Sequence, residues 1–530
     1  MILIVSLSAK NIHKSLAPWC LISAAQDRDV DVFESDINEN IMEIINGVFE
    51  RHPKAVVFSC YIWNITLIEK IASELKKLMP DCIFAAGGPE VSFRDTVPTP
   101  FDCIIKGGEY SFIKFADMVL NNDKIERGSF IYEDNPPFSE LPSPYTEKYF
   151  LSFKNGKMKD IKNQLVYYES SRGCRYGCTY CLSSAEQKLE FLPIERVKKE
   201  LLTIIGEGAS CIKFTDRTFN ADPLRAEEIL NFIKDLETDC TFHFEAGGDL
   251  FSERMLDIIK QMPPARVQFE IGIQTITDAS LEAVHRKTNF AKLTYAVNKL
   301  ISFGNCHIHL DLIAGLPKDN YDGINKSLDY CLSLKPHMLQ LGFLKLLRGS
   351  KLCNDTEGIV FLNEPPYEVL YSDGFNFMEL NRLRKIALIL DKFYNSGIYI
   401  NSIRYAQTLF ERPSAMLYAL NDFAEGRRIR SMSQKDSYAF LYEFMLRYGE
   451  KQKAEHYLKL DMLSFDPKGR YSLHEHRDKD AEDIYKKQTG SKNVRAEYFP
   501  YDGTIKIFDY RHKDPVTKSY FAGDFKEIID

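Results

Sequence analysis

The sequence predicts an α/β protein with a doubly wound parallel sheet, a partial (β/α)6 barrel and a mostly helical C-terminal domain. Three observations lead to this prediction. Short apolar runs alternate with helical patterns over residues 1–110, the alternation returns over 163–352, and the pattern beyond 355 is mainly helical. Strands that alternate with helices are typical of parallel sheets covered on both faces.

Length and composition indicate an ordinary globular protein of about two to four domains. The chain has 530 residues, of which 45% are apolar and 27% charged, and its net charge is −7. This charge does not favour a nucleic-acid binder, although a local basic patch stays possible. The apolar start MILIVSLSAK is typical of a buried first strand rather than a signal peptide, and no apolar run predicts a membrane helix. Twelve cysteines are too few for a secreted disulfide scaffold, so we expect a reducing, cytoplasmic location.

Residues 1–125 are expected to form the doubly wound, Rossmann-like domain. Its predicted strands are the apolar runs 2–8, 29–35, 55–61, 82–88 and 102–108. Ligands of such sheets bind beyond the carboxyl ends of the strands. The polar, aromatic and glycine residues at those ends are Ser6, Ser8, Ser59, Tyr61, Trp63, Asn64, Gly87, Gly88, Pro89 and Glu90.

A second set of strands follows a connector. Residues 126–162 are rich in Pro, Ser and charge, which predicts an extended linker. Residues 163–354 are expected to form a partial, TIM-like barrel with its site at the C-terminal strand ends. The predicted barrel strands are 164–170, 211–216, 241–246, 267–273, 307–315 and 338–345.

The remaining residues, 355–530, are expected to form a mainly helical domain. Their tail includes RAEYFPYDGTIKIFDYRH, which predicts a β-hairpin with its turn at Asp502-Gly503. The aromatics of this region could line a substrate pocket or simply pack.

Three cysteines stand close together in SSRGCRYGCTYCLSS. Cys174, Cys178 and Cys181 have the spacing C-x3-C-x2-C, so their thiolates can converge from one loop. Two of the thiols could form a disulfide, which would leave one over. Zinc normally needs a fourth Cys or His, and none lies within ten residues. Three thiolates suit a 4Fe–4S cluster that keeps one iron open, and Gly173 and Gly177 would let the loop bend around it.

This motif resembles the signature of radical S-adenosylmethionine (SAM) enzymes, C-x3-C-x-aromatic-C after the first barrel strand, with Tyr180 as the aromatic residue. The resemblance implies a 4Fe–4S cluster on the three cysteines, whose open iron binds the amino and carboxylate groups of SAM. One electron from the cluster then cleaves SAM to methionine and a 5′-deoxyadenosyl radical. A zinc knuckle or chance thiols are the alternatives.

Later segments resemble the same family more loosely. KFTDRTFNAD is similar to a segment of the subgroup with an added cobalamin domain, FHFEAGG ends the third strand, FEIGIQTI resembles the E-x-G-x-Q-S/T strand, and DLIAGLPKD resembles a G-L-P-G segment. Lys318 departs from this last pattern, where glycine is common. The resemblance implies that SAM is bound by Tyr180, Asp216, Glu245, Glu270, Gln274, Ile313, Gly315 and Leu316. Each polar residue alone could instead be a hydrogen-bonded strand end.

The first two domains together resemble the cobalamin-dependent (B12-binding) radical SAM enzymes. GGPEVS is similar to the G-G-P-x-x-S loop of their cobalamin domain, whose glycines let the backbone approach the corrin or its nucleotide tail. KGGEYSF resembles the R-G-E-G-E-x-x-F segment that follows, with departures at Gly108 and Tyr110. The resemblance adds Gly107 and Glu109 to the strand-end residues named above as cobalamin-binding residues.

The sequence offers cobalt no D-x-H-x-x-G histidine. His13 is the only histidine in the first 50 residues, and we interpret it as a hydrogen-bonded loop residue. Tyr61 and Trp63 could cover the lower face of the corrin, although Trp63 could equally be buried core.

The resemblance implies a cobalamin-dependent radical SAM enzyme, with a C-terminal domain of unknown function. The hypothesis is methyl transfer to an unactivated carbon, using a 5′-deoxyadenosyl radical and methylcobalamin. One alternative is a radical rearrangement, cyclisation or reduction without methyl transfer, and another is a non-catalytic cobalamin sensor or structural module. The implied partners are an electron donor such as flavodoxin or ferredoxin and a substrate that could be a small molecule, a peptide or a nucleotide.

Overall fold

The computed structural model describes residues 1–155, 160–184, 188–467, 473 and 475–529. The chain divides into two compact units, which we describe separately. Unit 1 holds residues 1–261, 284–287 and 344–370, and unit 2 holds 262–283, 288–343 and 371–530.

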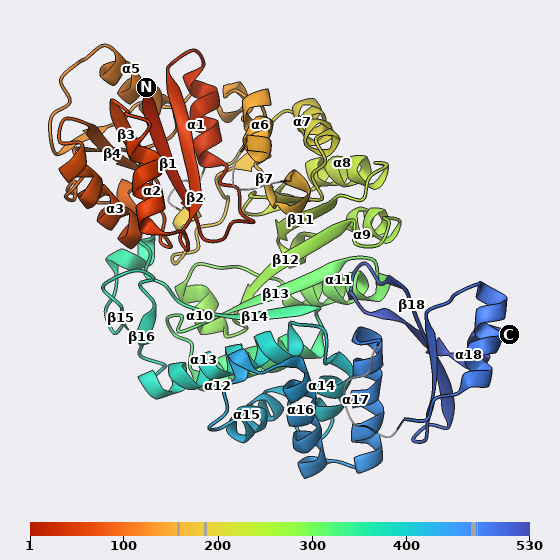
Figure 1. Ribbon diagram of the computed structural model, residues 1–530. Coiled ribbons are helices and arrows are strands. Elements are labelled where there is room, and N and C mark those ends of the chain that lie inside the picture. Colours follow the sequence, from red (N-terminus) through yellow and green to blue (C-terminus); the bar gives the residue numbers. More distant parts are fainter. Residues whose placement is uncertain (156–159, 185–187, 468–472, 474, 530) are drawn as a thin grey trace. The chain divides into compact units, whose positions relative to one another are not determined.

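Unit 1 begins with a six-stranded, wholly parallel sheet in the order β2-β1-β3-β4-β5-β6 (Figure 1). The bounds are β1 Ile2–Ser8, β2 Val30–Asp36, β3 Ala55–Ser59, β4 Ile83–Gly87, β5 Cys103–Ile105 and β6 Ser129–Ile131. All five expected strands are present, so the doubly wound sheet is confirmed. The order reverses at β1 and β3, which makes the carboxyl ends of these two strands the expected ligand edge.

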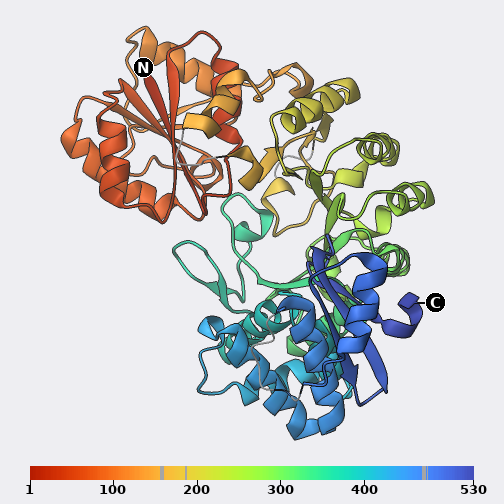
Figure 2. The same ribbon diagram turned by 45° about the vertical axis from the view of Figure 1, so that its right-hand side comes forward.

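Helices cover both faces of this sheet (Figure 2). Their bounds are α1 Ala17–Ala25, α2 Ile41–Phe49, α3 Ile65–Leu78, α4 Pro89–Ser92 and α5 Glu109–Leu120. Helices α2 and α3 pack together and bury their apolar residues against Leu3, Val5, Val56 and Phe58 of the sheet. Helices α1 and α5 pack together over the opposite face. Ser6 and Ser59 alternate with those core residues and therefore point to the α1 and α5 face.

The segment 126–162 is more structured than the extended linker that its composition predicts. It supplies β6, a 3-10 turn at Phe138–Glu140 and helix α6 at Glu147–Asn155. The apolar run in β6 is only three residues long, and proline-rich sequence follows it, so no periodic pattern reveals it. In α6, Tyr149 and Phe153 face the buried Lys14 ammonium, which lies 5.5 and 4.6 Å from their ring centres.

The second parallel sheet has six strands in the order β14-β13-β12-β11-β10-β7, as the partial barrel predicts. Unit 1 supplies β7 Val166–Tyr168, β10 Cys211–Phe214 and β11 Thr241–Ala246, with helices α7 Ile194–Gly206, α8 Pro223–Lys234 and α9 Glu253–Lys260. Unit 2 supplies β12 Val267–Gln274, β13 His307–Ala314 and β14 Met338–Phe343, with helices α10 Asp278–Ala283, α11 Phe290–Phe303 and α12 Tyr321–Ser333.

Two further sheets have two strands each. Strands β8 Ser171–Arg172 and β9 Glu190–Phe191 pair in unit 1, directly before and after the described parts of the cysteine loop. After β14, the segment 344–370 belongs to unit 1 and includes β15 Val360–Phe361, which pairs with β16 Val369–Tyr371.

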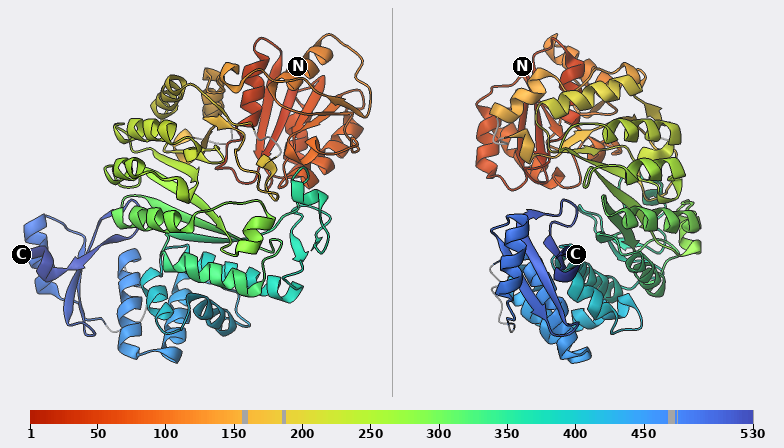
Figure 3. Two further views of the ribbon diagram at one scale, coloured as in Figure 1. Left: turned by 180° about the vertical axis from the view of Figure 1, so that it is seen from behind. Right: turned by 90° about the vertical axis from the view of Figure 1, so that its right-hand side faces the viewer.

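The C-terminal region of unit 2 is mainly helical, as expected. Its helices are α13 Phe377–Ile389 with a π-helical extension to Tyr394, α14 Ile400–Gln407, α15 Pro413–Phe423, α16 Gln434–Tyr448, α17 Lys451–Phe465, α18 Lys479–Thr489 and α19 Phe525–Ile529. The predicted hairpin is present as β17 Val494–Phe499 and β18 Thr504–Lys513, and β19 Tyr520–Asp524 adds a third antiparallel strand (Figure 3). Helix α18 packs on one face of this sheet through Tyr485, and α17 packs against Phe499 and Phe508 through Leu463.

Among the described residues, no helix combines the length and the apolar character that crossing a membrane would require.

Candidate functional site

The three cysteines lie together on one loop of unit 1, between β8 and residue 184. All twelve cysteines of the chain are free thiols. Cys178 is buried, whereas Cys174 and Cys181 are partly exposed. Gly173 has φ +89°, which lets the backbone turn just before Cys174. Burial raises the pKa of the Cys174 thiol, and the nearby Cys181 and Cys178 thiols add to this effect. The loop therefore presents three clustered thiols, as a three-thiolate cluster site requires.

Asp216 fixes the conformation of Ser170 and Ser171, the residues that connect β7 to this loop. Its Oδ1 accepts from the backbone nitrogens of Ser170 and Ser171 at 2.7 and 3.0 Å, and its Oδ2 accepts from the Ser170 hydroxyl at 2.5 Å. The carboxyl is buried, and burial raises its pKa to about 6. Both carboxylate oxygens are thus engaged inside the protein, so the structure gives Asp216 a task in shaping the loop. Its predicted contact with SAM stays a prediction.

Arg286 is a candidate that the sequence patterns do not reveal. Residues 284–287 belong to unit 1, and the Val284 carbonyl accepts from the backbone nitrogen of Thr179 at 3.1 Å. The Arg286 guanidinium lies 4.0 Å from the Cys178 thiol. Burial lowers the pKa of Arg286, but Tyr180 and Cys178 outweigh it and raise that pKa. A cation is therefore held beside the cysteine loop, where it can bind an anionic group.

Tyr180 is half-buried. Burial raises the pKa of its phenol, and Cys178 and Cys181 add to this rise, while Arg286 opposes it. The aromatic residue of the cysteine motif therefore lies in the electrostatic environment of the same guanidinium and thiols. In the neighbouring strand β11, Glu245 is half-buried near the carboxyl end.

In unit 2, Gln274 has two features that are typical of ligand-binding residues. Its Oε1 atom is buried without a hydrogen-bond partner among the described residues. Its backbone has φ +70°, and the β12–β13 register shifts between Gly272 and Gln274. Strained backbone and an unsatisfied buried polar atom are both features that concentrate at ligand sites. Both features support the predicted ligand contact of Gln274, which stays a prediction.

Glu270 lies beside two polar residues of β13. Glu270 pairs in register with His309, and one ligand atom each from Glu270, His309 and Asp311 lie within 4.8 Å of one another. His309 Nε2 is 3.0 Å from Asp311 Oδ1. These groups can bind hydroxyl or amino groups, and their oxygen and imidazole donors could also hold a cation.

The predicted SAM-binding residues at the end of β13 and just after it differ in their exposure. Leu316 is fully buried, so its side chain belongs to the core and only its backbone can meet a ligand. Gly315 has φ +91°, and Ile313 is half-buried. Lys318 has φ +59°, which explains physically why a glycine is common at this position.

The predicted cobalamin residues share one edge of the N-terminal sheet. Ser6 pairs in register with Ser59, and Ser59 with Gly87, so the ends of β1, β3 and β4 are adjacent. Gly88 has φ +105°, and a Cβ atom there would lie 2.6 Å from the Cys60 carbonyl oxygen. Glycine is therefore required at this position by the neighbouring loop itself, whereas the sequence suggested only a need to approach the corrin.

Asn64 joins two strand ends instead of facing outward. Its Nδ2 donates to the carbonyls of Leu7 and Ser59 at 2.9 and 3.0 Å, and its Oδ1 accepts from the Tyr61 nitrogen at 2.8 Å. Its side chain is buried. Asn64 thus shapes the edge, and its predicted contact with cobalamin stays a prediction.

Trp63 is not buried core. It is 43% exposed, its Nε1 donates to the Leu7 carbonyl at 3.1 Å, and its ring stacks on Tyr61 with 4.4 Å between centroids and 7° between planes. The pair forms a flat, anchored apolar surface beside the strand ends. His13, as interpreted from the sequence, is a hydrogen-bonded loop residue, since its Nδ1 lies 2.8 Å from the Tyr167 hydroxyl.

Glu90 and Glu109 are both buried and both engaged by other side chains. Glu90 accepts a hydrogen bond from the Tyr367 hydroxyl, with Arg348 3.9 Å away, and burial raises its pKa. Glu109 is bound by Arg172 at 3.0 and 3.1 Å. Gly107, by contrast, is exposed and has φ +94°. The two glutamates therefore hold loops together, and a direct role at cobalamin stays a prediction for each.

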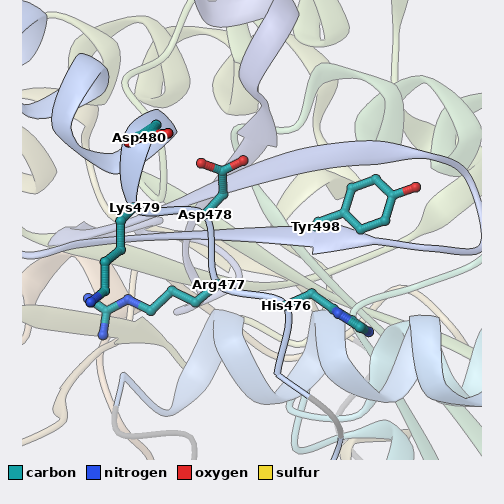
Figure 4. A pocket seen from close by; sticks show the side chains of 6 residues that line it. All are labelled: His476, Arg477, Asp478, Lys479, Asp480 and Tyr498. Carbon is teal, nitrogen blue, oxygen red and sulfur yellow. The ribbon is translucent and has the colours of Figure 1, made fainter.

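The C-terminal sheet carries a separate open depression of about 500 Å³ in unit 2 (Figure 4). Its lining is strongly polar, from His476, Arg477, Asp478, Lys479, Asp480 and Tyr498. Arg477 is already paired with Glu482 at 2.6 Å. The depression shows no further converging groups among the described residues, so we assign it no chemistry.

Three family models match successive parts of the chain. The B12 binding domain matches residues 2–112, the Radical SAM superfamily matches 168–331, and a protein of unknown function, DUF4080, matches 356–521. The matches follow the same order as the N-terminal sheet, the cysteine-bearing barrel and the helical region described above.

Curated relatives include radical SAM methyltransferases. The chain is 25% identical over 351 residues to the cobalamin-dependent radical SAM methyltransferase TokK of Streptomyces tokunonensis, covering 58% of this chain and 49% of TokK. It is 23% identical over 303 residues to the uncharacterized methyltransferase PH0819 of Pyrococcus horikoshii, covering 53% of this chain and 64% of that protein. The chain thus spans about half the length of the first methyltransferases it matches.

Solved structures support the fold. OxsB, a cobalamin-dependent SAM radical enzyme solved with aqua-cobalamin and SAM, has a TM-score of 0.56 at 15% identity, covering 87% of this chain and 78% of OxsB. TsrM of Kitasatospora setae, solved with cobalamin and a [4Fe-4S] cluster, has a TM-score of 0.52 at 15% identity, covering 69% of this chain and 78% of TsrM. The chain thus carries, in this order, a match to the B12 binding domain, a match to the Radical SAM superfamily and a match to DUF4080.

Proposed function

We propose that this protein is a cobalamin-dependent radical SAM methyltransferase that methylates an unactivated carbon. The observation that carries the proposal is the presence in unit 1 of both a three-thiol loop and a strand-end edge that offers a stacked Trp63–Tyr61 surface. When bound, the cluster supplies the electron that cleaves SAM, and cobalamin supplies a carrier for a methyl group. The curated relatives named as methyltransferases favour the same chemistry.

The cysteine loop fits a 4Fe–4S cluster. Cys174, Cys178 and Cys181 would hold it, leaving one iron without a protein ligand. Asp216 orients the entry to the loop through Ser170 and Ser171. Arg286 lies near enough to Cys178 to bind an anionic group beside the loop, such as a carboxylate.

The strand-end edge fits a flat cofactor. Gly107 is exposed with positive φ, so the backbone there has no side chain to block a close approach. The stacked Trp63 and Tyr61 rings offer a flat face, and His13 is hydrogen-bonded to Tyr167. Trp63 and Tyr61 would hold a corrin by apolar contact, and the cofactor would supply a carrier for a methyl group there.

We assign the following roles to residues of the chain. The cysteines bind the cluster, Arg286 orients SAM, and the Trp63–Tyr61 surface excludes water from one side of the corrin. The chain would have to hold the substrate carbon within reach of both cofactors, since positioning controls such transfers. Free thiols at every cysteine suit a reducing cytoplasm, and a flavodoxin or ferredoxin would supply electrons.

A radical reaction without methyl transfer is the second candidate. The specific observation in its favour is that OxsB, whose fold is similar, is named a radical enzyme and not a methyltransferase. The mass of the product separates the two candidates, because methylation adds one carbon. The test is to incubate the reduced, cofactor-loaded protein with SAM and quantify S-adenosylhomocysteine and 5′-deoxyadenosine. Formation of both supports the methyltransferase, and 5′-deoxyadenosine alone supports the second candidate.

A further inference from the structure

One arginine in unit 1 joins the predicted cobalamin loop to the cysteine loop. Glu109 begins helix α5 directly after Gly107 and Gly108, and Arg172 stands two residues before Cys174. Arg172 donates through Nη1 to Glu109 Oε2 at 3.1 Å and through Nη2 to Glu109 Oε1 at 3.0 Å. This is the two-pronged geometry in which an arginine holds a carboxylate most firmly.

The same guanidinium also holds Glu169 at the end of β7. Its Nε lies 3.2 Å from Glu169 Oε1, and its Nη2 lies 2.8 Å from Glu169 Oε2. The face of the guanidinium stacks on the Phe138 ring, 4.6 Å from the ring centre. Arg172 therefore ties together the start of α5, the end of β7 and the connector.

Both carboxylate oxygens of Glu109 are engaged by other side chains. Glu109 is only 4% exposed, and its Oε2 also accepts from Asn135 Nδ2 at 2.9 Å. Asn135 Oδ1 in turn accepts from the Tyr110 backbone nitrogen at 2.9 Å, which fixes the amide. A buried ion pair of this kind persists only where hydrogen bonds compensate its desolvation, and here they do.

The charges in the network favour this arrangement. Two carboxylates share one guanidinium. Removing the Glu109 carboxylate would leave Arg172 bound to Glu169 alone, so the Gly107-Gly108 loop would no longer be held against the cysteine loop.

We propose that Glu109 and Arg172 are positioning residues, which lock the Gly107-Gly108 loop against the cysteine loop so that the two cofactors face one substrate carbon. The inference rests on the proposed function. The bidentate ion pair between Glu109 and Arg172, which we call the clamp, is a property of the protein alone. Transfer between two cofactors depends on the distance between them. A weakened clamp would therefore broaden the distribution of that distance without removing either cofactor.

Helix α5 offers a matched control. Asp117 lies on the same helix and is held by Arg28, with Nε 2.6 Å from Oδ1 and Nη2 2.8 Å from Oδ2. This pair joins α5 to the chain after α1 and does not involve the cysteine loop. Glu109→Gln and Asp117→Asn therefore remove the same kind of charge from the same helix, and only the first cuts the clamp. Arg172→Lys keeps the charge but loses the two-pronged contact.

The first measurement is hydrogen exchange on the full chain purified without added cobalamin. In Glu109→Gln and Arg172→Lys, we expect the amides of residues 172–181 to exchange about tenfold faster than in the parent protein. In Asp117→Asn, we expect no change there. This readout depends on neither cofactor chemistry nor substrate.

The second measurement is pulsed electron paramagnetic resonance on protein loaded anaerobically with iron, sulfide and hydroxocobalamin, then reduced. The dipolar coupling between cob(II)alamin and the reduced cluster should give one narrow distance in the parent and in Asp117→Asn. It should broaden or shift in Glu109→Gln and Arg172→Lys, with iron and cobalt content retained.

Unchanged exchange in both clamp variants overturns the proposal, and so does an unchanged distance distribution. A parent protein that binds no cobalamin would instead defeat the proposed function, while hydrogen exchange would still decide whether the clamp exists. If Glu109→Gln does not fold, Arg172→Lys gives the decision.

Discussion

The Arg286 guanidinium lies 4.0 Å from the Cys178 thiol, although 108 residues separate the two in sequence. A cation is therefore placed at the loop that would hold the cluster, and its charge is maintained against burial by Tyr180 and Cys178. This relationship leads to the first prediction.

Arg286→Leu should weaken the binding of SAM about ten- to hundred-fold, because a charge-assisted contact contributes about 1.5–3 kcal/mol. Iron content should stay near that of the parent, since Arg286 is not a cluster ligand. Equilibrium binding of radiolabelled SAM to the reconstituted protein measures the effect. Arg175→Leu is the control, because Arg175 is also on this loop but donates to the Ala221 carbonyl. Equal SAM affinity in Arg286→Leu and the parent would contradict the role of Arg286.

Replacing any one of Cys174, Cys178 and Cys181 with alanine should reduce iron after anaerobic reconstitution to near background. Each thiolate supplies one of three ligands, and two leave the cluster under-coordinated. Cys211→Ala is the matched control, since Cys211 is a half-buried free thiol on β10 of the same barrel. Iron and sulfide analysis checks the result. Retention of iron by all three variants would show that the cluster is held elsewhere.

Trp63→Ala should open the lower face of a bound corrin to water. The indole is anchored to the Leu7 carbonyl and stacked on Tyr61, so its loss removes the apolar cover. We expect the electron paramagnetic resonance spectrum of cob(II)alamin to shift toward the five-coordinate, water-bound form. The other tryptophan supplies the control, because Trp19 is buried and Trp19→Phe should leave the spectrum unchanged. Identical spectra for Trp63→Ala and the parent would place the corrin away from Trp63.

Asp461→Asn should destabilise the DUF4080 region by about 2–4 kcal/mol. The buried Asp461 carboxylate accepts four hydrogen bonds from Asn401 and Ser402, at the start of α14. An amide nitrogen would face donors where an acceptor is needed. Urea unfolding followed by circular dichroism gives the free energy, with Asp466→Asn as the control at the end of α17.

The stability contribution of Asp461 should also depend on pH. Burial raises its pKa in the folded protein to about 6, from the usual value of 3.8. Between these values the folded state binds more protons than the unfolded state, so the contribution of this group rises as pH falls from about 7 to about 4. The difference corresponds to up to about 3 kcal/mol. The free energy of unfolding of the parent, relative to Asp461→Asn, should therefore increase over that interval. A difference that is flat with pH would contradict the raised pKa.

Much of the fold could be predicted because periodic apolar runs mark strands and helices locally. Strand β1 occupies the expected residues 2–8, and all six barrel strands fall within the expected runs or within one residue of them. Strand β6 was not predicted because its apolar run is only three residues long. Strand β19 was not predicted because apolar and polar residues do not alternate in YFAGD. Helix α16 ends at Gly449, where a Cβ atom would lie 2.4 Å from the Tyr405 hydroxyl, and this distant partner is not visible in the sequence.

The candidate site was predicted where residues share one loop or one strand end, and missed where partners are distant in sequence. The cysteine motif and the Trp63–Tyr61 pair are local patterns. By contrast, Glu109 meets Arg172 across 63 residues and Glu90 meets Tyr367 across 277. The sequence shows a glutamate beside a glycine loop in each case, but only the fold shows that each carboxylate is already bound by another side chain.

The most direct test of the central claim is anaerobic purification with iron, sulfide and hydroxocobalamin, followed by quantification of both metals and of SAM products after reduction. The account predicts about four irons and about one cobalamin per chain, with 5′-deoxyadenosine and S-adenosylhomocysteine both formed. Bound zinc in place of iron, with no cleavage of SAM, would contradict it.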